Sequence, residues 1–255
     1  MIGVVLYEGP SRFDPSREIA AIMTVSSNNK KTGGIPQVWM IDKAVSPNAA
    51  LKTGEDQALC GDCRLRSNGC YVITYQAPRS VREAYLRGAY LSGEKADKWW
   101  TSRARTYGWR AIRIGAYGDP YSVPIEVWET LQSRLKDAKI LGYTQQWRKD
   151  DAQPYAKFCM ASVFSESEAQ DALDLGWRYF RVRKSVDEPV LKNEIVCPAS
   201  KEQDYRMNCN VCRVCNGVKT KNSGGGTLDK DSRASVVIVA HGIKAKTAKF
   251  AKIIR

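Results

Sequence analysis

Histidine is almost absent from this 255-residue chain, in which His241 is the single one. That scarcity disfavours zinc sites that combine cysteine with histidine. Long hydrophobic runs are also missing: no stretch of about 18 apolar residues occurs, so the sequence predicts no transmembrane helix. The apolar N-terminus has neither the basic residues nor the small-residue cleavage site of a signal peptide. We therefore expect a cytoplasmic protein that does not bind membranes.

Acidic residues are in deficit, because 40 Lys and Arg face 27 Asp and Glu, which gives a formal charge of +13. A basic surface attracts nucleic acids, anionic cofactors and acidic partners. No aromatic–basic motif for nucleic-acid binding accompanies the charge, so a solvated surface is the simpler interpretation. Residues 26–34 (SSNNKKTGG) have the composition of a phosphate-binding loop without the Walker spacing. We interpret them as a surface loop; alternatively, Asn28, Lys30 and Lys31 fold over an active face.

Cysteine, in contrast, is plentiful: seven of the eight cysteines fall in two groups. Residues 58–72 contain the first cysteine group, which has the spacing C-x2-C-x6-C and consists of Cys60, Cys63 and Cys70. Residues 197–217 contain the second cysteine group, which has the spacing C-x11-C-x2-C-x2-C and consists of Cys197, Cys209, Cys212 and Cys215. In a reducing cytoplasm, grouped cysteines bind metal more often than they form disulfides.

The spacing of the second cysteine group is typical of four-iron cluster ligation, with three closely spaced cysteines and a remote one followed by Pro198. Zinc is the alternative metal. In the first cysteine group, three thiolates leave one iron without a protein ligand. The sequence thus predicts two [4Fe-4S] clusters, the first with an open coordination position. We expect Cys159 to lie too deep in its strand to be a fourth ligand, as a small buried hydrophobe.

Strand-like and helix-like segments alternate along the chain. Strands are expected within residues 37–41, 109–118, 139–147, 157–165, 177–183, 194–200 and 234–242. Helices are expected to begin at Ser80 and Ser165, each followed by a glutamate at capping-box spacing, and near Pro124. The aromatic segment 98–109 is expected to pack a helix onto the sheet. The alternation predicts an α/β fold with a mainly parallel sheet.

We expect this sheet to form a partial (β/α) barrel of the TIM type with a Cys-rich C-terminal loop; an open doubly wound sheet is the alternative. Residues 1–217 would form the barrel-like domain that carries both cysteine sites. Residues 218–255 would add a Gly-rich loop, a final strand and a basic tail. Loops that follow parallel strands gather at one face, where active sites form.

Several residues at or near the ends of the other expected strands should lie close to both cysteine groups at that face. They are Gly118, Asp119, Pro120, Gln145, Gln146, Ser162, Arg181 and Arg183. Among the residues near these strand ends, Asp119, Tyr121, Gln145 and Arg181 are the catalytic candidates. His241 ends the last expected strand, where it is either bonded to the backbone or acts as a base or ligand.

In its two cysteine groups, its GAYGDP segment and its expected barrel, the chain resembles the radical SAM superfamily. The resemblance implies a partial β/α barrel in which three cysteines, in the loop after the first barrel strand, bind a four-iron cluster that chelates S-adenosylmethionine. It also implies that Gly115, Gly118, Asp119 and Pro120 (GAYGDP) contact the methionine part of that cofactor, and that the second cysteine group holds an auxiliary cluster. The chain departs from the family in one respect: it has C-x2-C-x6-C where the family has C-x3-C-x2-C.

The chain is also similar to uncharacterised Cys-rich proteins encoded by bacteriophages, which implies expression in the cytoplasm of a bacterial host. Our leading hypothesis is a two-cluster iron–sulfur protein, either a SAM-dependent enzyme or a redox enzyme. The alternatives are a non-catalytic electron carrier or redox sensor, and a zinc-stabilised nucleic-acid-binding protein. The expected partners are a small-molecule ligand or an electron donor.

Overall fold

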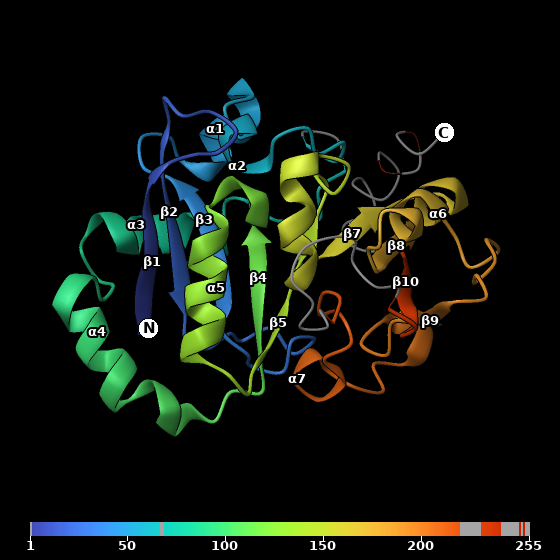
Figure 1. Ribbon diagram of the computed structural model, residues 1–255. Helices are drawn as coiled ribbons and strands as arrows, with labels where there is room; N and C mark the ends of the chain where they lie inside the picture. The colour runs from blue at the N-terminus through green and yellow to red at the C-terminus, as the bar shows by residue number, and fades with distance from the viewer. Residues whose placement is uncertain (1, 67–68, 220–230, 241–249, 251, 253–255) are drawn as a thin grey trace.

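The computed structural model describes residues 2–66, 69–219, 231–240, 250 and 252, which form an α/β protein with two open sheets (Figure 1). The first sheet is mixed, and its strand order is β1-β2-β3-β4-β5. It consists of β1 (Gly3–Pro10), β2 (Glu18–Thr24), β3 (Gln37–Asp42), β4 (Ala111–Tyr117) and β5 (Lys139–Leu141). β1 and β2 are antiparallel to their neighbours, whereas β3, β4 and β5 run parallel.

The second sheet is parallel throughout, and its strand order is β6-β7-β8-β10-β9. It consists of β6 (Tyr143–Thr144), β7 (Met160–Val163), β8 (Tyr179–Arg183), β9 (Glu194–Val196) and β10 (Ser235–Val239). Only Gly142 separates β5 from β6 in the chain, so one segment passes from the first sheet into the second. Within the described residues, neither sheet closes into a barrel.

Short helices connect these strands. They are α1 (Pro47–Thr53), α2 (Gln57–Cys60), α3 (Ala77–Leu86), α4 (Gly93–Ser102), α5 (Ile125–Arg134), α6 (Glu166–Asp174) and α7 (Cys209–Cys212). Turns of 3-10 helix lie at Ala104–Tyr107, Pro120–Ser122, Asp150–Lys157 and Lys201–Gln203. Trp99 and Trp100 of α4, and Trp128 and Leu131 of α5, are buried in the same core as the first sheet, which confirms the expected packing of the aromatic segment.

All seven expected strand segments contain an observed strand, which confirms the predicted α/β class. The sequence patterns above do not predict β1 and β2. β2 is buried at every position after Glu18, so it lacks the alternation of polar and apolar residues that marks a half-buried strand. No helix in the described part of the chain is both long enough and apolar enough to cross a membrane.

Two of the expected helix starts have different outcomes. Ser165 is the N-cap of α6, where its hydroxyl accepts a hydrogen bond from the Glu168 N–H, and this confirms the prediction. The start at Ser80 is wrong, because α3 already begins at Ala77 with Pro78 in its first turn. The Ser80 N–H is bonded to the Gln76 carbonyl, so Ser80 lies inside the helix rather than capping it.

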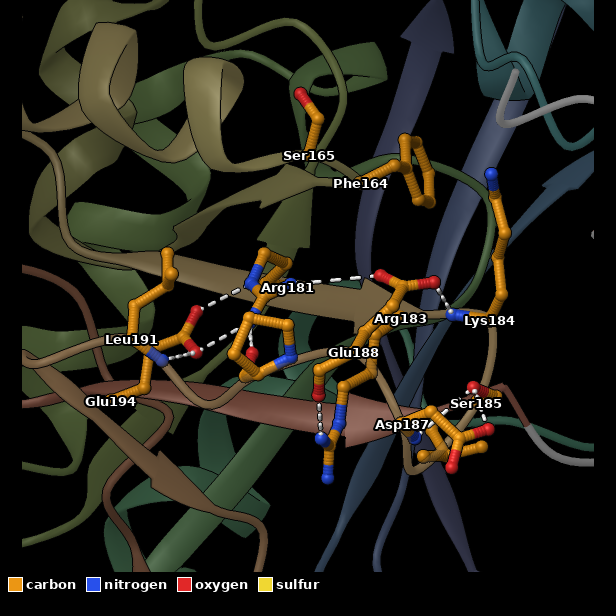
Figure 2. Close-up of polar contacts among 12 residues, drawn as sticks. Phe164, Ser165, Arg181, Arg183, Lys184, Ser185, Asp187, Glu188, Leu191 and Glu194 are labelled. Atoms are coloured by element: carbon orange, nitrogen blue, oxygen red, sulfur yellow. Dashed lines mark hydrogen bonds and ion pairs between the residues drawn. The ribbon is translucent and has the colours of Figure 1, made fainter.

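A buried ion pair fixes the connection between β8 and β9 (Figure 2). Arg181 donates to both carboxylate oxygens of Glu194, over 2.6 and 2.7 Å, and also to the Pro189 carbonyl at 2.7 Å. The Glu194 side chain is fully buried and that of Arg181 is 3% exposed. Glu194 additionally accepts from the Leu191 N–H, so this network ties residues 184–193 to the second sheet.

We predict that Arg181→Met destabilises the protein by about 3–5 kcal/mol, because it leaves the Glu194 carboxylate buried without its partner. Urea unfolding followed by circular dichroism measures this change. Arg79→Met is the matched control, since the Arg79–Glu83 pair lies on the exposed side of α3 and its loss should barely move the unfolding midpoint. Equal effects of the two substitutions would contradict the structural role of Arg181.

Candidate metal centre

A cavity of about 290 Å³ opens on one face of both sheets. Its wall consists of alternate strand residues, because successive side chains of a strand point to opposite faces. The wall residues are Arg113, Gly115 and Tyr117 of β4, Leu141 of β5, Tyr143 of β6, Ser162 of β7, Phe180 and Val182 of β8, and Ile238 of β10. The two sheets thus present a common face to one space.

The first cysteine group lies where β4 ends. Cys60 is the last residue of α2, and Cys63 and Cys70 follow in the next loop, where the Cys63 N–H donates to the Cys60 carbonyl at 3.1 Å. Arg66 fixes the loop by donating to the Asp56 carboxylate and to the Gly54 and Gly61 carbonyls. A 2.7 Å hydrogen bond from the Asp119 N–H to the Leu59 carbonyl joins the loop to the end of β4.

The second cysteine group is held by β9, α7 and the chain that follows α7. Cys197 comes directly after β9, and its N–H donates to the Val237 carbonyl of β10 at 2.8 Å. Cys209 and Cys212 are the two ends of α7, and the Cys209 N–H donates to the Lys31 carbonyl at 3.0 Å. Asn208 caps α7 through the Val211 N–H.

Arg178 anchors the chain around Cys215. This buried guanidinium donates to the carbonyls of Val214, Asn216 and Ala234 at 3.0, 2.7 and 2.5 Å. Val214 and Asn216 are the two neighbours of Cys215, so the hydrogen bonds hold that thiol against β10. The sequence analysis does not single out Arg178, and no motif marks it.

All seven grouped cysteines line the cavity, although 126 residues lie between Cys70 and Cys197 in the chain. None of the eight cysteines forms a disulfide. Cys159 lies just before β7, is fully buried in the core, and is not among the residues that line the cavity. Its position agrees with the expectation that it lies too deep to reach the first cysteine group.

The two groups line one cavity but extend toward different ends of the first sheet. Cys197 directly follows β9, as expected of a ligand at a strand end. The first group lies beyond Tyr117, the last residue of β4, where the Asp119 N–H donates to the Leu59 carbonyl. In Figure 1, α2 lies at the end where β4 finishes and α7 at the end where it starts. This corrects the expectation that both whole groups gather at the carboxyl ends of the strands, because α7 carries Cys209 and Cys212.

Burial raises the pKa of Cys60 in the first group and of Cys197 and Cys209 in the second, and neighbouring thiols raise it further. The pKa of Cys63 reaches about 12, although hydrogen bonds from the backbone act to lower it. Arg113 and Lys31 act in the opposite direction on Cys209, because their positive charges stabilise its thiolate. A thiol of raised pKa stays protonated at neutral pH unless a bound metal cation stabilises its thiolate. Without such a cation, these cysteines are therefore thiols.

The GAYGDP segment contributes three of its four predicted residues to the cavity: Gly115, Gly118 and Asp119 line it, and Pro120 does not. Gly118 adopts a φ of 81°, and a Cβ there would lie 2.8 Å from the Met40 side chain. The Asp119 carboxylate accepts hydrogen bonds from the Tyr121 and Gln145 N–H groups, both at 2.9 Å. Burial nevertheless raises its pKa to about 6.

The structure separates the four catalytic candidates. Asp119 and Gln145 line the cavity, where the Gln145 amide donates to the Ser162 hydroxyl at 2.9 Å. Tyr121 instead donates to Asp151 at 2.5 Å and, together with Tyr155, packs around Arg12. Arg181 belongs to the buried ion pair described above.

Of the other residues expected at the active face, some line the cavity and some do not. Lys31 lines the cavity together with Asn29, whereas Asn28 and Lys30 do not. Neither Gln146 nor Arg183 lines it; Arg183 instead binds the Glu188 carbonyl and the Glu202 carboxylate. His241 and most of the basic tail lie outside the described residues.

Sequence reasoning missed several polar residues of the cavity, among them Tyr71, Arg113 and Tyr143. The alternation in AIRIGAY would have placed Arg113 on the same face as Gly115, two residues further along β4. Tyr71 carried no signal beyond following Cys70.

Among the described residues, no group of three or more Cys, His, Asp or Glu side chains is arranged to hold a single metal ion. Comparison of the chain with family models, with curated proteins and with solved structures gives no match.

We predict that Arg178→Met destabilises the protein by on the order of 3 kcal/mol, because three buried carbonyls lose a charged donor. It should also make Cys215 react faster with a thiol reagent, as measured by mass spectrometry of the labelled peptide. Arg213→Met is the control, since the Arg213 side chain donates within its own turn, to the Val211 carbonyl at 3.3 Å. A Cys215 that reacts at the same rate in both variants would show that Arg178 does not hold this loop.

Proposed function

We propose that the protein is an iron–sulfur protein that binds two [4Fe-4S] clusters, one at each cysteine group. The observation that carries the proposal is the meeting of all seven grouped cysteines in one cavity, while the eighth is excluded from it. Convergence of distant thiols on a common space is what a bulky thiolate-ligated cofactor requires. Cys60, Cys63 and Cys70 would hold one cluster, and Cys197, Cys209, Cys212 and Cys215 the other.

The donor set fits iron–sulfur clusters in chemistry and in charge. Thiolate is the ligand these clusters take most often, and among the described residues that line the cavity there is no histidine. Lys31 and Arg113 beside the second cysteine group would offset the negative charge of a cluster with four thiolates. Zinc on the second group remains the alternative, and metal analysis separates the two.

We further propose that the two sheets are the wall of a partial β/α barrel of the radical SAM kind. In support, β3, β4 and β5 run parallel, every strand of the second sheet does too, and β5 continues into β6 through a single glycine. The shared cavity face across both sheets is also what a curved wall would give.

The first cysteine group offers three thiolates, so a cluster there would supply one-electron chemistry and an open iron position. Of the four catalytic candidates, Asp119 and Gln145 are the two that line this cavity. Two N–H donors orient the Asp119 carboxylate toward a fixed position, and Ser162 orients the Gln145 amide. These groups can bind the polar part of a small ligand, for which the amino-carboxylate of S-adenosylmethionine is one candidate. A redox enzyme without that cofactor, or an electron carrier, would use the same clusters.

Cysteine variants test the cluster assignment. We predict that anaerobically purified protein is brown and contains about eight irons and about eight sulfides per chain, and that Cys212→Ala reduces both to about four. Cys159→Ala is the matched control and should keep about eight irons, because this thiol does not line the cavity. Loss of a cluster in Cys159→Ala would instead make the first site a plain four-cysteine one.

Addition of S-adenosylmethionine tests the enzyme hypothesis. We predict that the EPR signal of the reduced first cluster changes when this compound is added, since its amino-carboxylate would occupy the open iron. The same addition should leave the spectrum of a Cys60→Ala/Cys63→Ala protein, which retains only the second cluster, unchanged. Identical wild-type spectra with and without the compound would rule out the radical SAM hypothesis and favour an electron carrier or redox sensor.

A further inference from the structure

We propose that Arg113 is the fixed positive charge that couples the two cysteine groups and allows both to hold a cluster at the same time. The inference rests on the proposed function. It assigns to Arg113 a positioning and electrostatic role between the two sites.

The position of Arg113 is rigid. It is the third residue of β4, where it pairs with Gln37 of β3 on one side and with Leu141 of β5 on the other. Its side chain points into the cavity, as does that of Tyr117 on the same face of β4. A guanidinium on a strand flanked on both sides moves little when a cofactor enters, so its charge stays in place.

The contacts of Arg113 reach toward both groups. On one side its guanidinium donates to the Tyr71 hydroxyl, and Tyr71 follows Cys70 directly in the chain. On the other side the guanidinium lies 5.9 Å from the centre of the Tyr143 ring, and Tyr143 packs against the apolar cluster that contains Cys215. The Arg113 Nε is buried and has no hydrogen-bond partner among the described residues.

Charge balance explains why a cation is needed at this point. A four-iron cluster in its oxidised resting state carries about −2 with four thiolates and about −1 with three, so two clusters in one cavity repel each other. A guanidinium is always protonated in proteins, so Arg113 carries a positive charge, and this charge opposes the repulsion between the sites.

Lys31 provides the comparison. Its carbonyl accepts the Cys209 N–H of the second cysteine group, whereas the Arg113 guanidinium also donates to Tyr71, beside Cys70 of the first group. We therefore expect Lys31 to affect the second cluster alone, whereas Arg113 should affect both.

The test is the iron content of reconstituted Arg113→Met protein in two backgrounds. With both cysteine groups intact, we expect about four irons in place of about eight, because loading one group hinders the other. In a Cys209→Ala/Cys212→Ala background, the first group should load its four irons equally well with and without the Arg113→Met substitution. Arg113→Lys should restore about eight irons, and Arg79→Met, which removes an exposed charge on α3, should keep them.

Redox titration followed by EPR gives a second readout on proteins with one group each. Arg113→Met should lower the midpoint potential of either cluster, because a nearby cation stabilises the reduced form, whereas Lys31→Met should lower only that of the second. The proposal is overturned if Arg113→Met keeps about eight irons, or if it loses the first cluster even without the second group, which would indicate a local folding role. Wild-type protein that binds no iron would instead refute the proposed function itself.

Discussion

The gathering of seven thiols around one cavity is the constraint on which the rest of this structure depends. Removing a thiolate from water is costly, and desolvation raises the pKa of Cys60 and Cys63 in the first group and of Cys215 in the second. Such a site becomes stable in its charged form only if a metal centre or a nearby cation compensates the charge. The placement of Arg113 and Lys31 beside Cys209 is consistent with a site built to carry negative charge.

The fold supplies that constraint through strand geometry. One face of β4, β5, β6, β7, β8 and β10 walls the cavity. A backbone hydrogen bond fastens each cysteine group. The Asp119 N–H, just after β4, donates to the Leu59 carbonyl beside Cys60, and the Cys197 N–H donates to the Val237 carbonyl of β10. Buried ionic groups secure the connections outside the cavity. Arg181 holds the segment between β8 and β9, and Arg178 holds the chain on both sides of Cys215.

Much of this arrangement could be predicted from local sequence, and the failures have physical causes. Cysteine spacing and strand periodicity are local signals, so the two groups, the seven segments that contain β3 to β10 and the position of Asp119 beside the cavity could be anticipated. The run of buried apolar residues in β2 hides its strand character, and α3 begins at Ala77 rather than at the serine that matches a capping pattern. The return of the chain from β9 to the start of β4, and the arginines it meets there, depend on long-range packing that no short motif encodes.

The most direct test of the central claim is Mössbauer spectroscopy of protein reconstituted anaerobically with ⁵⁷Fe. Two clusters held by three and by four cysteines predict about eight irons, of which about one has a coordination distinct from the thiolate-bound rest. That distinct iron should vanish from the spectrum of a Cys60→Ala/Cys63→Ala protein and remain in that of a Cys209→Ala/Cys212→Ala protein. A colourless protein with zinc at the second cysteine group and no iron at the first would contradict the account.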